Sequence, residues 1–238
     1  MILVYKGEGV SPLSLKHTVR TLRTFYSNGI SFVDYPDLEQ VQSFEKASCI
    51  VFPGGRDIPY HENISIEGIK NIQSFVSCGG VFIGICAGAY FASSSIEFAK
   101  GTNLEVCGDR YLKLVPSTAI GPVYGPYVYS GHESAVAATI SDGNEIHAVY
   151  FNGGCYFKDA RAYDLKILST YENGEAAIVS SRYGDGSVLL SGVHFEYDAD
   201  YLDSQDLHLQ KLIPKLKEYN EARKKLVVSL LSTIRVKV

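Results

Sequence analysis

The architecture of this chain follows from one stretch, Val81-Phe82-Ile83-Gly84-Ile85-Cys86-Ala87-Gly88-Ala89-Tyr90. Its apolar first half predicts a buried strand, and residues 87–98 are compatible with a helix that follows it. The cysteine between them is flanked by Gly84 and Gly88, the G-x-C-x-G form of a strand-turn-helix nucleophile elbow. Small neighbours permit a tight turn and a close ligand, and a helix N-terminus favours the thiolate. Taken alone, the motif fits a small buried residue in a strand–helix corner equally well.

Composition limits the classes of protein to which this chain can belong. Its 238 residues are 46% hydrophobic and 20% charged, as in a globular protein with one large α/β domain or two small ones. A net charge of -4 gives no electrostatic signature of nucleic-acid binding. The apolar N-terminal run is too short for a signal peptide, and no stretch approaches the ~20 apolar residues of a membrane span.

The five cysteines are an odd number and show no C-x-x-C spacing. This pattern argues against a disulfide framework or a zinc site and favours a reducing compartment. We therefore expect a cytoplasmic protein that binds neither nucleic acid nor a membrane.

Strand-like and helix-like segments alternate along the first hundred residues. The strands are expected at 2–5, 30–33, 49–52 and 81–85, and the helices at 13–26, which Ser11 caps ahead of Pro12, at about 38–46, and at 64–76. This alternation predicts a parallel sheet covered by helices on both faces. Ligands bind such sheets at the carboxyl ends of the strands. The loops at 7–10 and 53–57 and the elbow at Cys86 are therefore expected at one edge.

The second half of the chain has a different texture. Short segments rich in β-formers, separated by Gly, Pro and Asn, predict mostly antiparallel strands that continue the same domain, at 111–115, 123–129, 134–140, 148–151, 176–181 and 187–191. The last two flank a plausible hairpin turn. From about 203 to 238 the pattern predicts one or two amphipathic helices, broken near Pro214. They dock on the sheet or on a partner subunit, with a membrane surface as the weaker alternative.

A cysteine nucleophile needs a base, and the base needs an orienting group. Of six histidines, His194 stands out because it follows the strand-like run 188–193 and precedes Phe195-Glu196. In an extended backbone His194 and Glu196 project to the same side, so the carboxylate can hold one imidazole nitrogen while the other faces the thiol. The alternative is an exposed histidine at a strand end beside a solvated glutamate.

These motifs together resemble a known family. The order of strand, Gly-Gly loop, G-x-C-x-G elbow and late His-x-Glu is similar to that of the class I glutamine amidotransferase-like family. The closer resemblance is to the amino-terminal, amidotransferase-like domain of eukaryotic-type biotin–protein ligases and its stand-alone relatives. The residues that carry it are Val4-Tyr5, Gly7-x-Gly9-Val10-Ser11-Pro12-x-Ser14-Leu15-Lys16-His17, Phe52-Pro53-Gly54-Gly55-Arg56-Asp57-x-Pro59-Tyr60, Gly84 to Tyr90, Tyr150-Phe151-Asn152-Gly153-Gly154-Cys155-Tyr156-Phe157 and Gly192-x-His194-x-Glu196.

The resemblance implies a flavodoxin-like three-layer sandwich, with residues 1–238 as a single domain and about 203–238 as a helical extension. It also implies a Cys-His-Glu triad, which maps to Cys86, His194 and Glu196. The backbone N–H of Ala87 and one from Gly54 or Gly55 would form the oxyanion hole.

Other residues near these loops have two interpretations each. Arg56, Asp57 and Tyr60 fit contacts to the polar end of a substrate, or a salt bridge and a turn. Asn152-Gly153-Gly154 fits a tight turn near the same edge, where it could contact the ligand.

Two further groups fit the chemistry less well. Cys155 is a rival nucleophile without an elbow. His132-Glu133 lacks further ligands at metal-binding spacing and fits a loop near the site or a surface pair. We expect no metal and no cofactor.

Three functions follow from these residues. The first is a cysteine-dependent amidase or glutaminase-type hydrolase that acts on a small amide. The alternative is a non-catalytic binding or regulatory module, linked to biotin metabolism or a partner enzyme, that recognises a small molecule or a protein. The third is a peptidase-like hydrolase. We expect no ligase activity, because no Gly-Arg-Gly-Arg adenylate loop and no segment for a ligase catalytic domain are found, and no synthase domain accompanies the fold.

Overall fold

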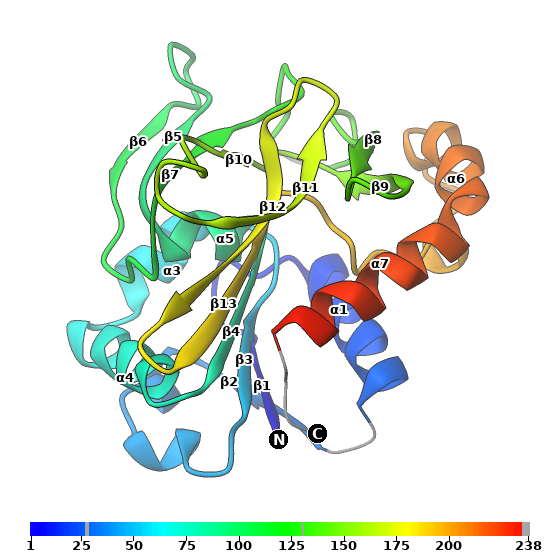
Figure 1. Ribbon diagram of the computed structural model, residues 1–238. Coiled ribbons are helices and arrows are strands. Elements are labelled where there is room, and N and C mark those ends of the chain that lie inside the picture. Colours follow the sequence, from blue (N-terminus) through cyan, green and yellow to red (C-terminus); the bar gives the residue numbers. More distant parts are fainter. Residues whose placement is uncertain (27–28, 130, 235–238) are drawn as a thin grey trace.

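The computed structural model describes residues 1–26, 29–129 and 131–234, and it places a large mixed sheet at the centre of the molecule (Figure 1). Over these residues the sheet has 13 strands, with the path β2-β1-β3-β4-β13-β12-β10-β7-β5-β6 and with β11, β8 and β9 branching from β12. The strands are β1 (Ile2–Tyr5), β2 (Ile30–Val33), β3 (Cys49–Phe52), β4 (Val81–Ile85), β5 (Ser93–Phe98), β6 (Val106–Asp109), β7 (Val115–Gly121), β8 (Val136–Ser141), β9 (Ile146–Phe151), β10 (Tyr156–Phe157), β11 (Lys166–Tyr171), β12 (Ala176–Tyr183) and β13 (Gly186–Ser191).

Strands β2, β1, β3, β4 and β13 run parallel to one another along this path. The alternation of strands and helices predicts this for the first four, and β13 is antiparallel to β12 on its other side. The fold is therefore α/β with a mostly parallel central sheet, consistent with a flavodoxin-like sandwich. The helices are α1 (Pro12–Phe25), α2 (Tyr35–Leu38), α3 (Asp57–Asn63), α4 (Ile66–Ser77), α5 (Ala87–Ala92), α6 (Leu209–Glu218) and α7 (Asn220–Thr233), with 3-10 turns η1 (Val41–Phe44) and η2 (Ala199–Tyr201).

Helices cover both faces of the parallel strands (Figure 1). Alternate residues of each strand point to opposite faces, so each face forms its own apolar cluster. Leu3, Ile50 and Phe82 pack with α4 and α5, whereas Val4 and Val51 pack with α1 and α7. This two-sided burial explains why the strands have continuous apolar sequences instead of alternating ones.

The start of α1 and the hairpin of the second half are confirmed. Ser11 accepts a hydrogen bond from the N–H of Ser14, and Pro12 is the first residue of α1. Strands β12 and β13 pair antiparallel from Ile178–Ser191 to Tyr183–Gly186. Because β13 also pairs in parallel with β4, the hairpin joins the antiparallel half of the sheet to the elbow strand.

The expected helix over 87–98 is wrong in its second half. Helix α5 ends at Ala92, and Ser93–Phe98 forms β5 between β6 and β7. The Ser93 hydroxyl donates to the carbonyl of Ala89 at 2.9 Å, which satisfies a carbonyl at the end of the helix. The Ser93-Ser94-Ser95 run therefore lies in a strand, because pairing with both neighbours outweighs a weak helical preference.

Three other predicted elements differ from the structure. Residues 111–114 precede β7, so only Val115 of the expected strand at 111–115 is in a strand, and 123–129 form irregular turns. Pro122 and Pro126 lack an N–H for a sheet ladder, which explains the loss of the strand at 123–129. The helix expected at 38–46 is reduced to α2 and η1.

The tail folds into two helices, but they meet at Tyr219 and not near Pro214. Pro214 lies inside α6, where buried Leu209 and Leu216 anchor both sides of it. Buried residues of α7 complete the apolar cluster that α1 forms with the sheet. Residues 235–238 of the predicted tail lie outside the described residues. Along 1–26, 29–129 and 131–234, no helix combines the length and apolarity that crossing a bilayer requires.

We expect Gly88→Ala to destabilise the protein by about 1–3 kcal/mol, because it forces a methyl group into a packed interior. A Cβ at this position would lie 2.2 Å from the carbonyl oxygen of Phe52. A Cβ on Gly29 meets nothing within 4 Å, so Gly29→Ala is the matched control and should change stability by less than about 0.5 kcal/mol. Urea unfolding of both variants measures the difference. Equal stability of the two would contradict this account of the β3–α5 contact.

Candidate functional site

Cys86 lies in the turn between β4 and α5. Its φ is 50° and its ψ is -103°, a left-handed backbone that residues with a side chain rarely adopt. Its N–H donates to the carbonyl of Ser191 at 2.8 Å, which ties the turn to the end of β13. The conformation agrees with a nucleophile elbow, in which a sharp turn exposes one side chain above the sheet.

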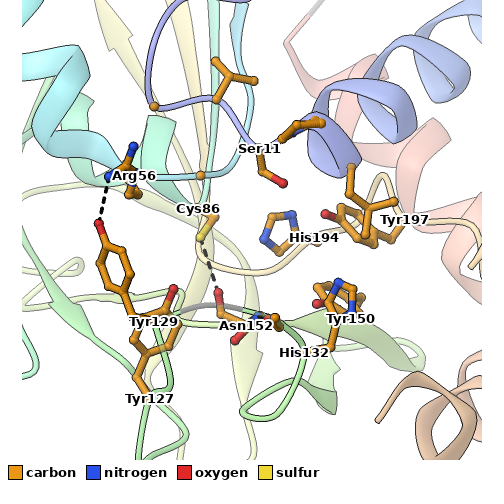
Figure 2. Close-up of a pocket in the computed structure, with 16 residues that line it drawn as sticks. Ser11, Arg56, Cys86, Tyr127, Tyr129, His132, Tyr150, Asn152, His194 and Tyr197 are labelled. Atoms are coloured by element: carbon orange, nitrogen blue, oxygen red, sulfur yellow. Dashed lines mark hydrogen bonds between the residues drawn. The ribbon is translucent and has the colours of Figure 1, made fainter. Parts of the chain in front are cut away.

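His194 follows β13 and lies beside Cys86 (Figure 2). Its N–H donates to the carbonyl of Tyr150 at 2.9 Å, so the end of β9 fixes its position. Its Nδ1 lies 2.8 Å from Oε1 of Glu196, and both side chains are buried. The alternative interpretation, an exposed histidine beside a solvated glutamate, is therefore wrong.

The environment of His194 favours the imidazolium form. Burial acts to lower the pKa of His194, but the neighbouring Glu196 carboxylate and Cys86 side chain outweigh it and raise this pKa to about 10. His194 therefore places a positive charge between the Glu196 carboxylate and the Cys86 side chain.

Ser14 of α1 links this group to the loop after β3. The Ser14 hydroxyl donates to Oε1 of Glu196 at 3.1 Å and accepts from the N–H of Gly54 at 2.8 Å. The carbonyl of Glu196 accepts from Thr21 of the same helix at 2.8 Å. Helix α1 therefore orients both Glu196 and the Gly54 loop through buried hydrogen bonds.

Gly54 lies close to both Cys86 and His194. A Cβ on Gly54 would lie 2.4 Å from Cε1 of His194 and 3.3 Å from Cβ of Cys86, so any side chain here would collide with the imidazole. The first loop approaches from the other side, where the N–H of Ser11 donates to the Gly54 carbonyl at 2.9 Å. The prediction that the three loops share one edge of the sheet is confirmed.

The N–H groups expected to form the oxyanion hole differ in whether they already have a hydrogen-bond partner. The N–H of Gly54 already donates to Ser14, so it is not free for a ligand. Within the described part of the chain, no partner is found for the N–H of Gly55 or of Ala87. Of these three residues, Gly55 lines the cavity described below, whereas Gly54 and Ala87 do not.

A cavity of about 420 Å³ opens at Cys86 (Figure 2). Its floor includes Cys86 and His194, and four tyrosines contribute to its walls. Tyr150 and Tyr197 stack with ring centroids 4.4 Å apart, and His17 stacks behind Tyr197 at the same spacing. The remaining lining residues are Gly9, Val10, Ser11, Pro12, Leu13, Gly55, Arg56, Tyr127, Tyr129, Gly131, His132 and Asn152.

The three residues after the Gly-Gly loop have different environments. Arg56 lines the cavity and donates to the Tyr129 hydroxyl at 3.1 Å. Asp57 instead forms an ion pair with Arg110 at 2.7 Å, and buried Tyr60 donates to the Pro53 carbonyl at 3.1 Å. Asp57 and Tyr60 do not line the cavity. The expected salt bridge is found for Asp57, but both residues lie in helix α3 and not in a turn.

Residues 152–154 also differ in whether they line the cavity. Asn152 lines the cavity, and its carbonyl lies 3.8 Å from Sγ of Cys86. The Gly153 carbonyl accepts from the Tyr90 hydroxyl at 3.0 Å, and a Cβ on Gly154 would lie 1.7 Å from the carbonyl oxygen of Gly192. Gly154 therefore allows a close backbone crossing, Gly153 packs against the ring of Tyr127, and neither lines the cavity.

Cys155 is fully buried behind the site, and burial raises the pKa of its thiol well above the ordinary value. It does not line the cavity, which removes it as a rival nucleophile. His132 does line the cavity, and its Nδ1 pairs with Asp206 at 2.9 Å. Over the described residues, no cluster of His, Cys, Asp and Glu could hold a metal ion.

Sequence reasoning gave no role to Ser14 or to the four tyrosines. Tyr150 could have been found, because it lies on the predicted strand 148–151 two residues before Asn152. Tyr127 and Tyr129 lie in an irregular segment with no periodic signal, and Ser14 bonds to Glu196 across 182 residues of sequence.

Ser14→Ala is expected to lower the free energy of unfolding by about 1–3 kcal/mol, because it leaves the buried Gly54 N–H without an acceptor and removes a donor to Glu196. Exposed Ser229 on α7 provides a matched control, and Ser229→Ala should be nearly neutral. Chemical denaturation of both variants measures the effect. A neutral Ser14→Ala would show that this bridge contributes nothing to the fold.

His17 should make stability depend on pH. Burial lowers the pKa of His17 to about 4, and its Nδ1 accepts from the N–H of Asp198 at 3.2 Å. Between about pH 6.5 and 4 the unfolded chain therefore binds the extra proton, and stability falls as pH falls, by up to about 1.4 kcal/mol per unit. His17→Gln keeps an acceptor and should flatten this part of the curve. Parallel pH curves for the two proteins would contradict the assignment.

Comparison with known proteins agrees with the sequence motifs. The model of the family "Biotin-protein ligase, N terminal" matches residues 1–238. An uncharacterized protein of Chlamydia muridarum is 33% identical over 98% of this chain and 96% of its own length. A biotin–protein ligase of Schizosaccharomyces pombe is 33% identical over 86% of this chain, which spans only 35% of that ligase.

A solved structure resembles the fold alone. The exo-β-1,4-mannosidase Op5Man5 of an Opitutaceae bacterium aligns with 97% of this chain and 36% of its own, at a TM-score of 0.55 and 12% identity. At 12% identity this structure says nothing about the family, which the sequence matches show instead. The chain belongs to the biotin-protein ligase, N-terminal family.

Proposed function

We propose that this protein is a cysteine-dependent amidohydrolase of the glutamine amidotransferase-like type, acting on a small amide. One observation carries the proposal. Cys86 has an elbow backbone at the floor of a cavity, beside an imidazole that Glu196 holds at 2.8 Å. A nucleophile, a base and a group that orients the base are the parts that nucleophilic amide hydrolysis requires.

In the proposed reaction, the Cys86 thiolate attacks the amide carbonyl carbon and forms a tetrahedral oxyanion. The N–H groups of Ala87 and Gly55 stabilise that oxyanion. The His194 imidazolium then protonates the leaving amine, and a thioester remains on Cys86. Neutral His194 next takes a proton from water, which hydrolyses the thioester to the acid and restores the thiol.

A second function is supported by a different observation. The chain is 33% identical to part of a biotin–protein ligase, and that part is 35% of the ligase. A binding or regulatory module linked to biotin metabolism would use the same cavity without turnover, and Cys86 would then contact a ligand without reacting. Amide turnover by the purified protein distinguishes the two functions.

We further propose that residues 1–238 act as one unit in a reducing compartment such as the cytoplasm. Strands from residue 2 to residue 191 join a single sheet, and α7 packs on the face that α1 covers, which supports a single domain. All five cysteines are free, which supports a reducing environment.

Cys86→Ala should abolish hydrolysis of small amides and labelling by a thiol-directed glutamine analogue, because both need the sulfur. Cys78→Ser, at an exposed cysteine outside the cavity, is the control and should keep wild-type rates. Glu196→Gln should lower kcat by about two orders of magnitude or more, because the imidazole loses its orienting carboxylate. Ammonia release and the mass of the labelled protein measure these effects.

The outcomes separate the candidate functions. Unchanged turnover in Cys86→Ala would overturn the amidohydrolase. Turnover of small peptides in preference to small amides would indicate a peptidase. A wild-type protein that binds ligand but never releases an amine would support the binding module.

A further inference from the structure

The cavity above Cys86 has an uneven charge distribution. Arg56 is a positively charged side chain in its lining, and among the described lining residues there is no aspartate or glutamate. Glu196 is 1% exposed and lies behind His194, so it does not reach the cavity. The cavity therefore presents the Arg56 guanidinium, the His194 imidazolium and tyrosine rings to a ligand.

Arg56 is held in place while its charge stays available. Its N–H donates to the Gly9 carbonyl at 2.8 Å, and its Nη1 donates to Tyr129, which extends toward it in Figure 2. Over the described residues, Arg56 forms no ion pair. A guanidinium has five N–H donors in a planar fork that matches a carboxylate, and one recorded side-chain bond leaves most of them for a ligand.

The nearby carboxylates have other partners. Asp206 lies behind His132 and also accepts from the N–H groups of His208 and Leu209, both within 3.0 Å. Glu8 accepts from Asn63 at 3.2 Å and does not line the cavity. Neither can hold an ammonium group inside the cavity, because neither carboxylate faces it.

We propose that the ligand of this cavity is an acyl compound with a carboxylate at the end remote from Cys86 and without a free ammonium group. The inference rests on the proposed function for placing the reacting carbonyl at Cys86. Arg56 binds the carboxylate, and the stacked Tyr150–Tyr197 pair lies along the cavity wall. Free glutamine fits less well, because its α-ammonium would have no carboxylate partner.

The backbone of Arg56 starts close to the elbow. Arg56 is two residues after Gly54, so their Cα atoms are at most about 7 Å apart. Gly54 itself is in contact range of Cys86, since its Cβ position is 3.3 Å from that of the cysteine. Arg56 and Cys86 therefore belong to neighbouring loops that line the same cavity.

Charged thiol reagents test the inference without turnover. Methanethiosulfonates transfer a thioalkyl group to a thiolate and release methanesulfinate, so sulfonatoethyl and trimethylammonioethyl reagents compare an anion with a cation at Cys86. We expect the anion-to-cation rate ratio at Cys86 to be about tenfold above that at Cys78 and Cys107 of the same molecule. Both reference cysteines are exposed, and peptide mass spectrometry reads each site separately.

Arg56→Gln is the matched variant, because glutamine keeps a donor for Tyr129 and removes the charge. The ratio at Cys86 should fall about tenfold in this variant while the ratios at Cys78 and Cys107 stay unchanged. An unchanged ratio at Cys86, or a preference for the cation in the wild type, would overturn the inference. So would a Cys86 that resists all reagents, since the cavity would then admit no ligand to the sulfur.

Substrates of equal length give a second readout. Glutaramate is glutamine without the ammonium, and glutaramide replaces its carboxylate by an amide. Glutaramate at millimolar concentration should protect Cys86 from neutral methyl methanethiosulfonate better than glutamine or glutaramide, and Arg56→Gln should remove the difference. Equal protection by all three would contradict the inference. If charge selectivity is found but none of the three compounds is hydrolysed, the proposed amidohydrolase activity is contradicted. The proposal that Arg56 binds a carboxylate ligand is then still supported.

Discussion

The buried carboxyl group of Glu196 connects parts of the chain that are distant in sequence. Its Oε1 contacts Nδ1 of His194 at 2.8 Å and the Ser14 hydroxyl at 3.1 Å, and Ser14 in turn holds the N–H of Gly54. A carboxyl group buried without partners would cost several kcal/mol, so these contacts constrain helix α1, the β3 loop and the segment after β13 together. Removal of the Ser14 hydroxyl, for example, leaves the Gly54 N–H without an acceptor and takes one hydrogen bond from Glu196.

This constraint explains why the site tolerates so little bulk. His194 and Cys86 both lie against Gly54, where a Cβ would lie 2.4 Å from the imidazole ring. The backbones at Gly154 and Gly192 cross just as closely, which brings the end of β9 beside the end of β13. The glycines therefore set the distances between strand ends, and the hydrogen bonds through Glu196 set the orientation of the side chains.

The parallel half of the fold could be predicted because its signals are local. Apolar runs, the Ser11-Pro12 helix start and the glycine loops each mark an element, and parallel strand ends bring Cys86, Gly54 and the first loop to one edge. The strand Ser93–Phe98 could not be predicted from local signals, because its conformation depends on pairing with β6 and β7. Ser14 could not be assigned either, since its partner is 182 residues away.

The two halves of the fold contribute differently to the site. Cys86, Gly54 and His194 come from the ends of parallel strands, whose geometry the sheet fixes. Tyr127 and Tyr129, which face Arg56, come from an irregular segment of the second half, and the tyrosine stack begins at Tyr150 of β9. The parallel half therefore positions Cys86, His194 and Arg56, whereas the second half contributes the tyrosine rings of the cavity wall. Because one fold can carry many functions, the charge and shape of this wall say more about the ligand than the fold does.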